Sequence, residues 1–149
     1  ELGYIKRTGV IKINPNFKYK FWPVNKKINT HSFEVTPVFI WRPELNNELS
    51  DRFLIARWGA YQNDSSTMGA VVKNRFTHLY RDFDPTRTNG VPLPVGSEYN
   101  FTNFEAYYSS PSSEDFSYTI TPSFGEFFNG KIKSIDLRLS YRIQPRFNS

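Results

Sequence analysis

Two histidines and the absence of cysteine limit the metal and nucleophilic chemistry open to this chain. His31 and His78 stand 47 positions apart, so neither has a partner at the short spacing of protein zinc sites. Without cysteine there is no thiolate ligand, no cysteine nucleophile and no disulfide scaffold. The serines include no Gly-x-Ser-x-Gly motif, the usual setting of a hydrolase nucleophile. We therefore predict no metal ligand, no cofactor and no catalytic serine.

Four carboxylates, Glu34, Glu105, Glu126 and Asp136, are the remaining candidates for general acid and base chemistry. Such chemistry commonly needs two carboxyl groups about 5–10 Å apart. These four fall in different segments and have Lys and Arg as neighbours, which favours structural ion pairs. We predict no catalytic residue. An enzyme with a converging carboxylate pair is the least favoured of three hypotheses, the other two being the membrane barrel and the soluble β-sandwich described below.

The charge of the chain is mildly basic, with 19 Lys and Arg against 14 Asp and Glu and a formal net charge of +5. Basic and aromatic residues alternate from Lys18 to Trp22, as in proteins that stack single-stranded nucleic acid. A β-strand produces the same alternation, and no block of five or six like charges occurs. We predict no nucleic-acid partner.

The composition indicates one folded domain over residues 1–149. The 14 Phe, 9 Tyr and 3 Trp argue against disorder. The sequence contains no run of about 18 apolar residues, so we expect no transmembrane helix. The chain begins with neither a methionine nor a charged and then apolar leader, so we expect a mature chain or a piece of one. No repeat or linker marks an internal boundary.

The strongest signal is an alternation of apolar and polar residues with period two, which is typical of β-strands. From Ile11 to Phe21 the odd positions are mainly apolar and the even ones are Lys or Asn. About seven strands follow from this pattern, at residues 11–22, 31–42, 52–62, 68–81, 99–109, 116–128 and 132–144. The sequence therefore predicts an all-β, antiparallel, up-and-down fold.

Prolines and turn residues refine these boundaries. Pro15, Pro37 and Pro122 lie on apolar faces, where each removes a backbone donor and marks an edge, a bulge or a strand end. Asn129-Gly130 predicts a two-residue hairpin turn with positive φ at both residues.

The expected strands span about 10–14 residues, whereas strands in globular proteins average about 5–6. A membrane barrel explains this length, because a tilted strand needs about 9–11 residues to cross the hydrocarbon. A soluble extracellular β-sandwich that binds glycans through Trp22, Trp41 and Trp58 also fits. Alternation supports the two architectures equally.

In the barrel interpretation the two parities of the strands face different surroundings. The polar positions expected to face the lumen are Lys12, Lys18, Glu34, Lys73, Arg75, Asp136, Arg138 and Arg142. The apolar positions expected to face lipid are Ile13, Phe17, Val35, Phe39, Leu137 and Leu139. The expected partners are a lipid bilayer or detergent, and further barrel strands or other membrane-protein chains.

Longer phrases of the sequence resemble one family. They run from Phe83-Asp84-Pro85-Thr86 to Asn89-Gly90-Val91-Pro92-Leu93-Pro94-Val95-Gly96, with support from residues 2–9, 19–31 and 125–145. In this order they resemble large outer-membrane-associated proteins of Bacteroidota. Members of that family carry an N-terminal domain similar to family-nine carbohydrate-binding modules, followed by a long β-rich C-terminal domain of unknown function.

The resemblance covers nearly the whole chain and implies an internal stretch of a transmembrane β-barrel in a bacterial outer membrane. The carbohydrate-binding domain lies outside this sequence, so the resemblance transfers no sugar site and no catalytic residue. It implies a non-enzymatic structural, transport or assembly role.

The count of strands leads to a further expectation about closure. Seven is odd, whereas bacterial single-chain barrels close with an even number of at least eight. We therefore expect the strands near 11–22 and 132–144 not to pair with each other. The wall would be completed by further strands.

Overall fold

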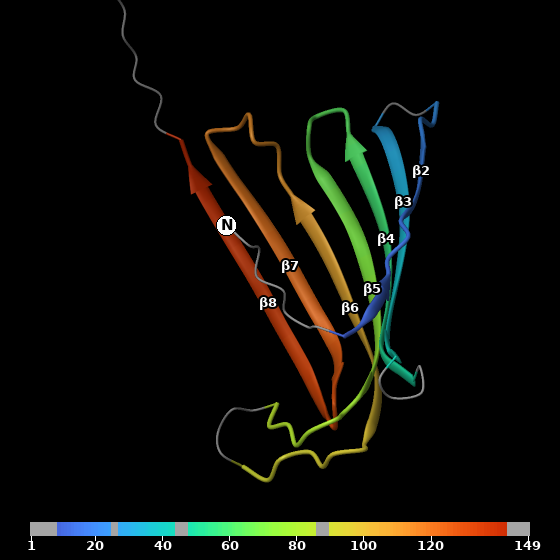
Figure 1. The fold of residues 1–149 in the computed structure, drawn as a ribbon. Helices are drawn as coiled ribbons and strands as arrows, with labels where there is room; N and C mark the ends of the chain where they lie inside the picture. The colour runs from blue at the N-terminus through green and yellow to red at the C-terminus, as the bar shows by residue number, and fades with distance from the viewer. Residues whose placement is uncertain (1–8, 25–26, 44–47, 86–89, 143–149) are drawn as a thin grey trace, which may run out of the picture.

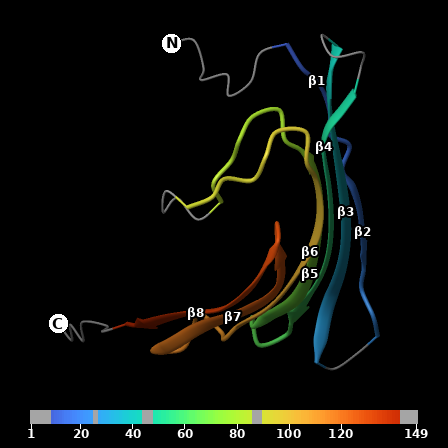
Figure 2. The same cartoon turned by 90° about the horizontal axis from the view of Figure 1, so that it is seen from below.

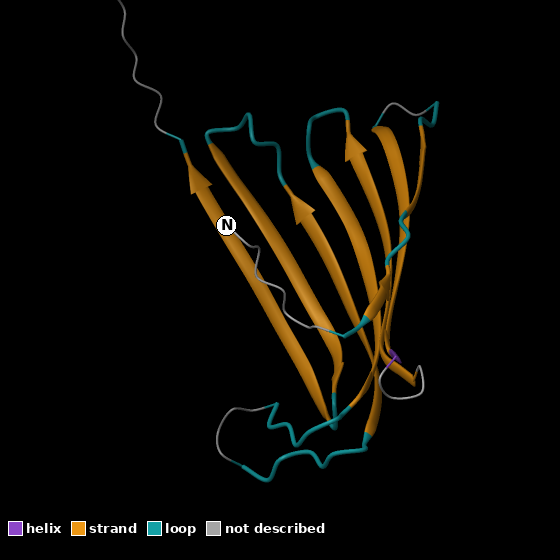
Figure 3. Cartoon of the chain, viewed as in Figure 1, coloured by secondary structure: helices purple, strands orange, loops and turns teal. Residues whose placement is uncertain are grey.

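A computed structural model describes residues 9–24, 27–43, 48–85, 90–142 of the chain. It contains eight β-strands, connected in antiparallel order (Figure 1). They are β1 (Ile11–Ile13), β2 (Phe17–Phe21), β3 (Ile28–Arg42), β4 (Glu48–Gln62), β5 (Thr67–His78), β6 (Glu98–Ser109), β7 (Phe116–Phe127) and β8 (Gly130–Tyr141). Strands and loops account for nearly all of the described chain (Figure 3), and within it no helix is long and apolar enough to cross a bilayer. The all-β, antiparallel, up-and-down prediction is confirmed.

The expectation of seven strands is wrong by one, because the first predicted strand is divided. Ile13 lies opposite Phe39 and Phe17 opposite Val35 on the same β3 strand. Pro15 therefore falls opposite Pro37, and neither residue has an N–H to donate. The edge of the sheet is interrupted where two prolines meet, so β1 and β2 are two parts of one edge.

Pro122 marks a second interruption, between β6 and β7. Register partners run from Asn103 to Glu105 and resume at Tyr108, so the ladder is missing where Ala106 and Tyr107 would face β7. Pro122 remains opposite Ile135 in the continuous ladder to β8. The proline therefore loses its pairing on one side only.

The β7–β8 turn differs from the expected one. Phe127 pairs with Gly130, so the two turn residues are Phe128 and Asn129, one position earlier than predicted. Phe128 carries the positive φ, 52°, which is rare for a bulky side chain. The Phe128 ring lies 5.2 Å from Phe101 and 5.1 Å from Phe83, so packing holds this residue in an unfavoured conformation.

The sheet is one curved layer whose ends do not meet. The strand order begins with β1 and β2 on β3 and ends with β8, and the described residues do not close it into a barrel. Figure 2 shows the sheet bending around an open space, with β2 and β8 at its two edges. As expected, the first and last predicted strands do not pair.

The densest packing lies at one end of the sheet, under the connection between β5 and β6. Figure 2 shows this connection on the inner side of the curve. Leu79, Leu93 and Phe101 are buried there, and the backbones of Phe83 and Leu93 exchange two hydrogen bonds of 3.0 and 2.8 Å. Residues 79–85 and 90–97, the described parts of this connection, thus form an arch that covers part of the inner face of the sheet. We call the inner face the concave face and the outer one the convex face.

Candidate functional site

The strand registers place a polar network in the middle of the concave face. Glu34 is at its centre: its carboxylate accepts hydrogen bonds from the Asn16 amide at 2.9 Å and from Arg57 at 3.3 Å. The Lys18 ammonium lies 3.8 Å from the same carboxylate. Further along the sheet, Lys73 donates to Glu105 at 2.6 Å. Both carboxylates are therefore occupied by cations of neighbouring strands.

The end of the concave face near the arch contains a buried acid. Asp51 is 1% exposed and accepts hydrogen bonds from the hydroxyls of Thr77 at 2.6 Å and Ser50 at 2.9 Å. Close by, the Arg42 guanidinium lies 4.5 Å from the centre of the Tyr80 ring. Burial, reinforced by the negative charge of Glu48, raises the pKa of the Tyr80 hydroxyl, so the phenol stays neutral. This region stabilises the arch.

The residues predicted to face a lumen share the concave parity of their strands. Those within strands are Lys12, Lys18, Glu34, Lys73, Arg75, Asp136 and Arg138. Arg142 follows β8, and its guanidinium donates to the carbonyl of Ser112 at 3.1 Å, which holds it at the β6–β7 connection. The registers bring together Lys18 and Glu34, but they leave Asp136 and Arg138 at the far edge. Exposure of these residues to a lumen stays a prediction.

The residues predicted to face lipid share the opposite, convex parity. Ile13, Phe17, Val35, Leu137 and Leu139 are each 40–63% exposed, and Phe39 is half-buried beside Trp41. They belong to a larger set of exposed apolar residues on the same face: Ile11, Tyr19, Phe33, Leu54, Val72, Phe104, Phe116, Tyr118, Ile120, Phe124, Ile135 and Tyr141. Together these residues form an apolar surface that extends across all strands of the sheet. Single apolar residues scattered over a protein surface are common, but a shared surface of this extent is not.

Polar residues border this surface at the end where the arch lies. Asn74 donates to Asn100 at 2.9 Å and to Thr102 at 3.0 Å, and Arg52 donates to Asn74 at 3.4 Å. All four residues have the convex parity. The convex face thus changes from apolar to polar toward one end of the strands.

The candidates for catalysis and metal binding do not converge. Glu34 and Glu105 lie in one row of the sheet, but two strands separate them, which places their backbones about 14 Å apart at about 4.8 Å per strand. Trp58 donates to His31 at 3.2 Å, and His78 lies 3.3 Å from Glu98. Among the described residues no three His, Asp or Glu side chains form a group that could hold a metal ion.

The tryptophans of the glycan-binding hypothesis are also dispersed. Trp41 pairs with Leu49 near one end of β3, whereas Trp58 pairs with Phe33 near the other. The two rows, at Phe33 and Trp41, are eight positions apart along β3, about 26 Å at about 3.3 Å per residue. Trp22 follows β2, outside the sheet. These three side chains do not form one aromatic platform.

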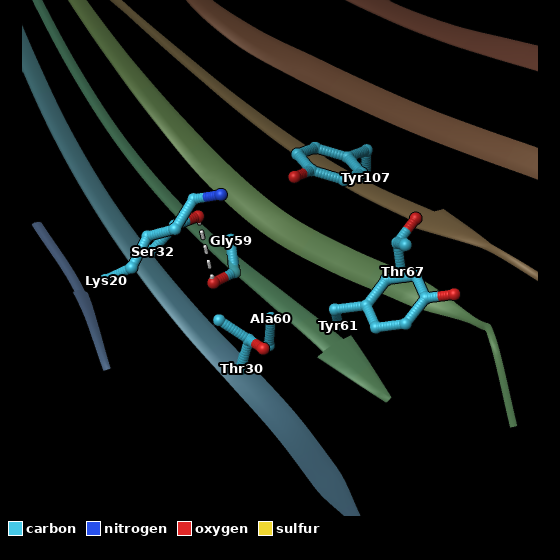
Figure 4. A pocket seen from close by; sticks show the side chains of 8 residues that line it. All are labelled: Lys20, Thr30, Ser32, Gly59, Ala60, Tyr61, Thr67 and Tyr107. Carbon is cyan, nitrogen blue, oxygen red and sulfur yellow. Dashed lines mark hydrogen bonds between the residues drawn. The ribbon is translucent and has the colours of Figure 1, made fainter. Parts of the chain in front are cut away.

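A hollow on the concave face was missed by sequence reasoning. It is an open depression of about 310 Å³ near the β4–β5 turn, and Figure 4 shows Lys20, Ser32 and Tyr107 around Gly59. A Cβ on Gly69 would lie 2.6 Å from the Tyr107 ring, so the ring lies directly over this glycine. The spacing of Gly59 and Gly69 around the turn at residues 63–66 was the available signal, because hairpin pairing brings the two glycines opposite each other.

Comparison with protein-family models, with curated proteins and with solved structures finds no match for this chain.

Proposed function

We propose that this chain forms part of the wall of a transmembrane β-barrel in a bacterial outer membrane, with a non-enzymatic structural, transport or assembly role. The observation that carries the proposal is the convex face, where large apolar side chains from every strand are exposed side by side. Exposing such a surface to water is unfavourable, because removing one Leu, Ile or Phe side chain from water lowers the free energy by about 1.5–3 kcal/mol. A bilayer is the surrounding that fits it.

The dimensions of the strands support the same proposal. Strands β5 to β8 have 12 residues each and β3 and β4 have 15. At about 3.3 Å per residue and a tilt of about 40°, a 12-residue strand covers roughly 30 Å along the membrane normal. An outer-membrane barrel has an apolar band about 25 Å tall.

The two edges of the sheet indicate that further strands belong to the wall. Among the described residues, β8 pairs only with β7, and β1 and β2 pair only with β3. In hydrocarbon, each unsatisfied N–H or C=O group costs several kcal/mol, so open edges do not persist. We propose that strands of the same barrel or of other membrane-protein chains cover both edges, in line with the resemblance to the Bacteroidota family.

Detergent dependence tests the proposal. Purified protein is transferred from detergent to detergent-free buffer and into lipid vesicles, and its strand content and its sedimentation are measured. A barrel wall stays folded in detergent and vesicles and aggregates in buffer. A protein that remains folded, monodisperse and unable to enter vesicles without detergent would overturn the proposal and support the soluble glycan-binding β-sandwich.

A further inference from the structure

One row of the sheet differs from its neighbours in carrying unused hydrogen-bond donors. This row crosses β2 to β6, and each of its residues lies opposite the next: Lys20, Ser32, Gly59, Gly69 and Tyr107. All five have the concave parity, and the two glycines remove side chains from the middle of the row. The Tyr107 ring lies over Gly69, and Lys20, Ser32, Gly59 and Tyr107 of this row line the hollow (Figure 4).

The donors converge on a point above Gly59. A Cβ on Gly59 would lie 3.1 Å from the Ser32 hydroxyl and 3.1 Å from the Tyr107 hydroxyl. The Ser32 hydroxyl has only a long hydrogen bond of 3.5 Å, to the Gly59 carbonyl, and among the described residues the Tyr107 hydroxyl has none. Figure 4 shows the Lys20 ammonium on the same side of the sheet, directed toward Tyr107. The Ser32 and Tyr107 hydroxyls thus meet above Gly59, and the Lys20 ammonium lies farther out on the same side.

The charge around this space is not compensated within the described part of the chain. Glu34, two residues from Ser32 on β3, pairs with Lys18 and Arg57. Glu105, two residues from Tyr107 on β6, pairs with Lys73. Lys20 makes no ion pair with any described residue. The hollow therefore combines one free ammonium with the hydroxyls of Ser32 and Tyr107, and Thr30, Tyr61 and Thr67 are among the other residues that line it.

We propose that the hollow above Gly59 binds an oxyanion, a carboxylate, phosphate or sulfate group of a small solute, between Lys20, Ser32 and Tyr107. An ammonium and two hydroxyls supply charge-assisted and neutral hydrogen bonds to its oxygens. The missing side chain at Gly59 lets the anion approach the sheet, whereas Gly69 makes room for the Tyr107 ring. The site stands on the concave face alone and does not depend on whether the convex face contacts lipid.

Calorimetric titration of the folded protein in detergent tests the site, at constant ionic strength set with chloride. The probes are inorganic phosphate, sulfate and acetate, with glycerol as a neutral control. We expect saturable binding of at least one oxyanion and none of glycerol, and the order among the probes identifies the preferred group. Absence of saturable oxyanion binding, or equal binding of glycerol, would overturn the proposal.

Three variants and one matched control locate the binding. Lys20→Gln should weaken it at least tenfold, Tyr107→Phe should weaken it severalfold, and Gly59→Ala should abolish it by filling the space between the two hydroxyls. Lys12→Gln is the control, because Lys12 is an exposed lysine of the same edge and the same face but lies outside the hollow.

Circular dichroism confirms folding of each variant, and if Gly59→Ala does not fold, the other two variants decide. Unchanged affinity in Lys20→Gln, or an equal loss in Lys12→Gln, would show that the hollow is not the site. Membrane insertion is measured separately, so a soluble protein that binds oxyanions would refute the proposed barrel and leave this site intact.

Discussion

Exchanging the character of two neighbouring residues in β8 tests the assignment of the two faces. Leu137 has the convex parity, is 58% exposed and lies opposite Ile120, within the edge strand β8 and away from both of its ends. Arg138 has the concave parity and lies opposite Thr119, and within the described residues it forms no ion pair. Leu137→Arg places a charge among the apolar side chains, whereas Arg138→Leu removes one from the polar face.

The expected effects differ by surroundings. At the midplane of a bilayer an arginine on the lipid face costs about 2–4 kcal/mol, which is roughly a 30- to 900-fold change in the folding equilibrium. On a water-exposed sheet the same substitution stays within about 0.5 kcal/mol, as most surface substitutions do. Arg138→Leu should also remain within about 0.5 kcal/mol, because no described partner loses a bond.

Urea titration of protein folded into lipid vesicles measures both variants, with migration on a gel before and after heating as a second readout of the folded state. We expect a large loss of the free energy of unfolding for Leu137→Arg and almost none for Arg138→Leu. Equal effects of the two variants, or a neutral Leu137→Arg, would refute the placement of the convex face in lipid.

Three further outcomes are expected. Gly69→Ala should destabilise the sheet by more than Gly59→Ala, because the new Cβ would lie 2.4 Å from the backbone oxygen of Trp58 rather than near movable side-chain ends; chemical denaturation of the two variants compares them, and the reverse order would contradict the geometry. The hydroxyl and the N–H of Ser66 donate to Asp64 and hold the pKa of this carboxyl below its usual range. The stabilisation of the turn by the Asp64 carboxylate is therefore present above about pH 3.8 and is lost as the pH falls through the lowered pKa. Amide exchange at Ser66 should show this loss in the wild type, and Asp64→Asn should show no such pH-dependent step. Positions on the concave face carry more Lys and Arg than Asp and Glu, so a conducting barrel in planar bilayers should prefer anions, and cation selectivity would contradict this expectation.

The strands and their two faces followed from the sequence alone. Side chains alternate across any β-strand, so the period-two pattern separated Lys18 from Phe17 and Arg138 from Leu137 without knowledge of their neighbours. Pro15 and Pro122 were correctly expected to disturb pairing, because a proline lacks a donor wherever it stands. These features depend on local geometry, which each segment carries by itself.

Contacts between distant segments were decided only by the tertiary structure. The meeting of Pro15 with Pro37 depends on the register of two strands, and the positive φ of Phe128 depends on packing against Phe83 and Phe101, far along the chain. The hollow above Gly59 needed the alignment of five strands, because its donors are up to 87 positions apart. The curvature and the open edges likewise arise from how all strands associate. Alternation determines which way a side chain points, but only strand register and packing determine what it meets.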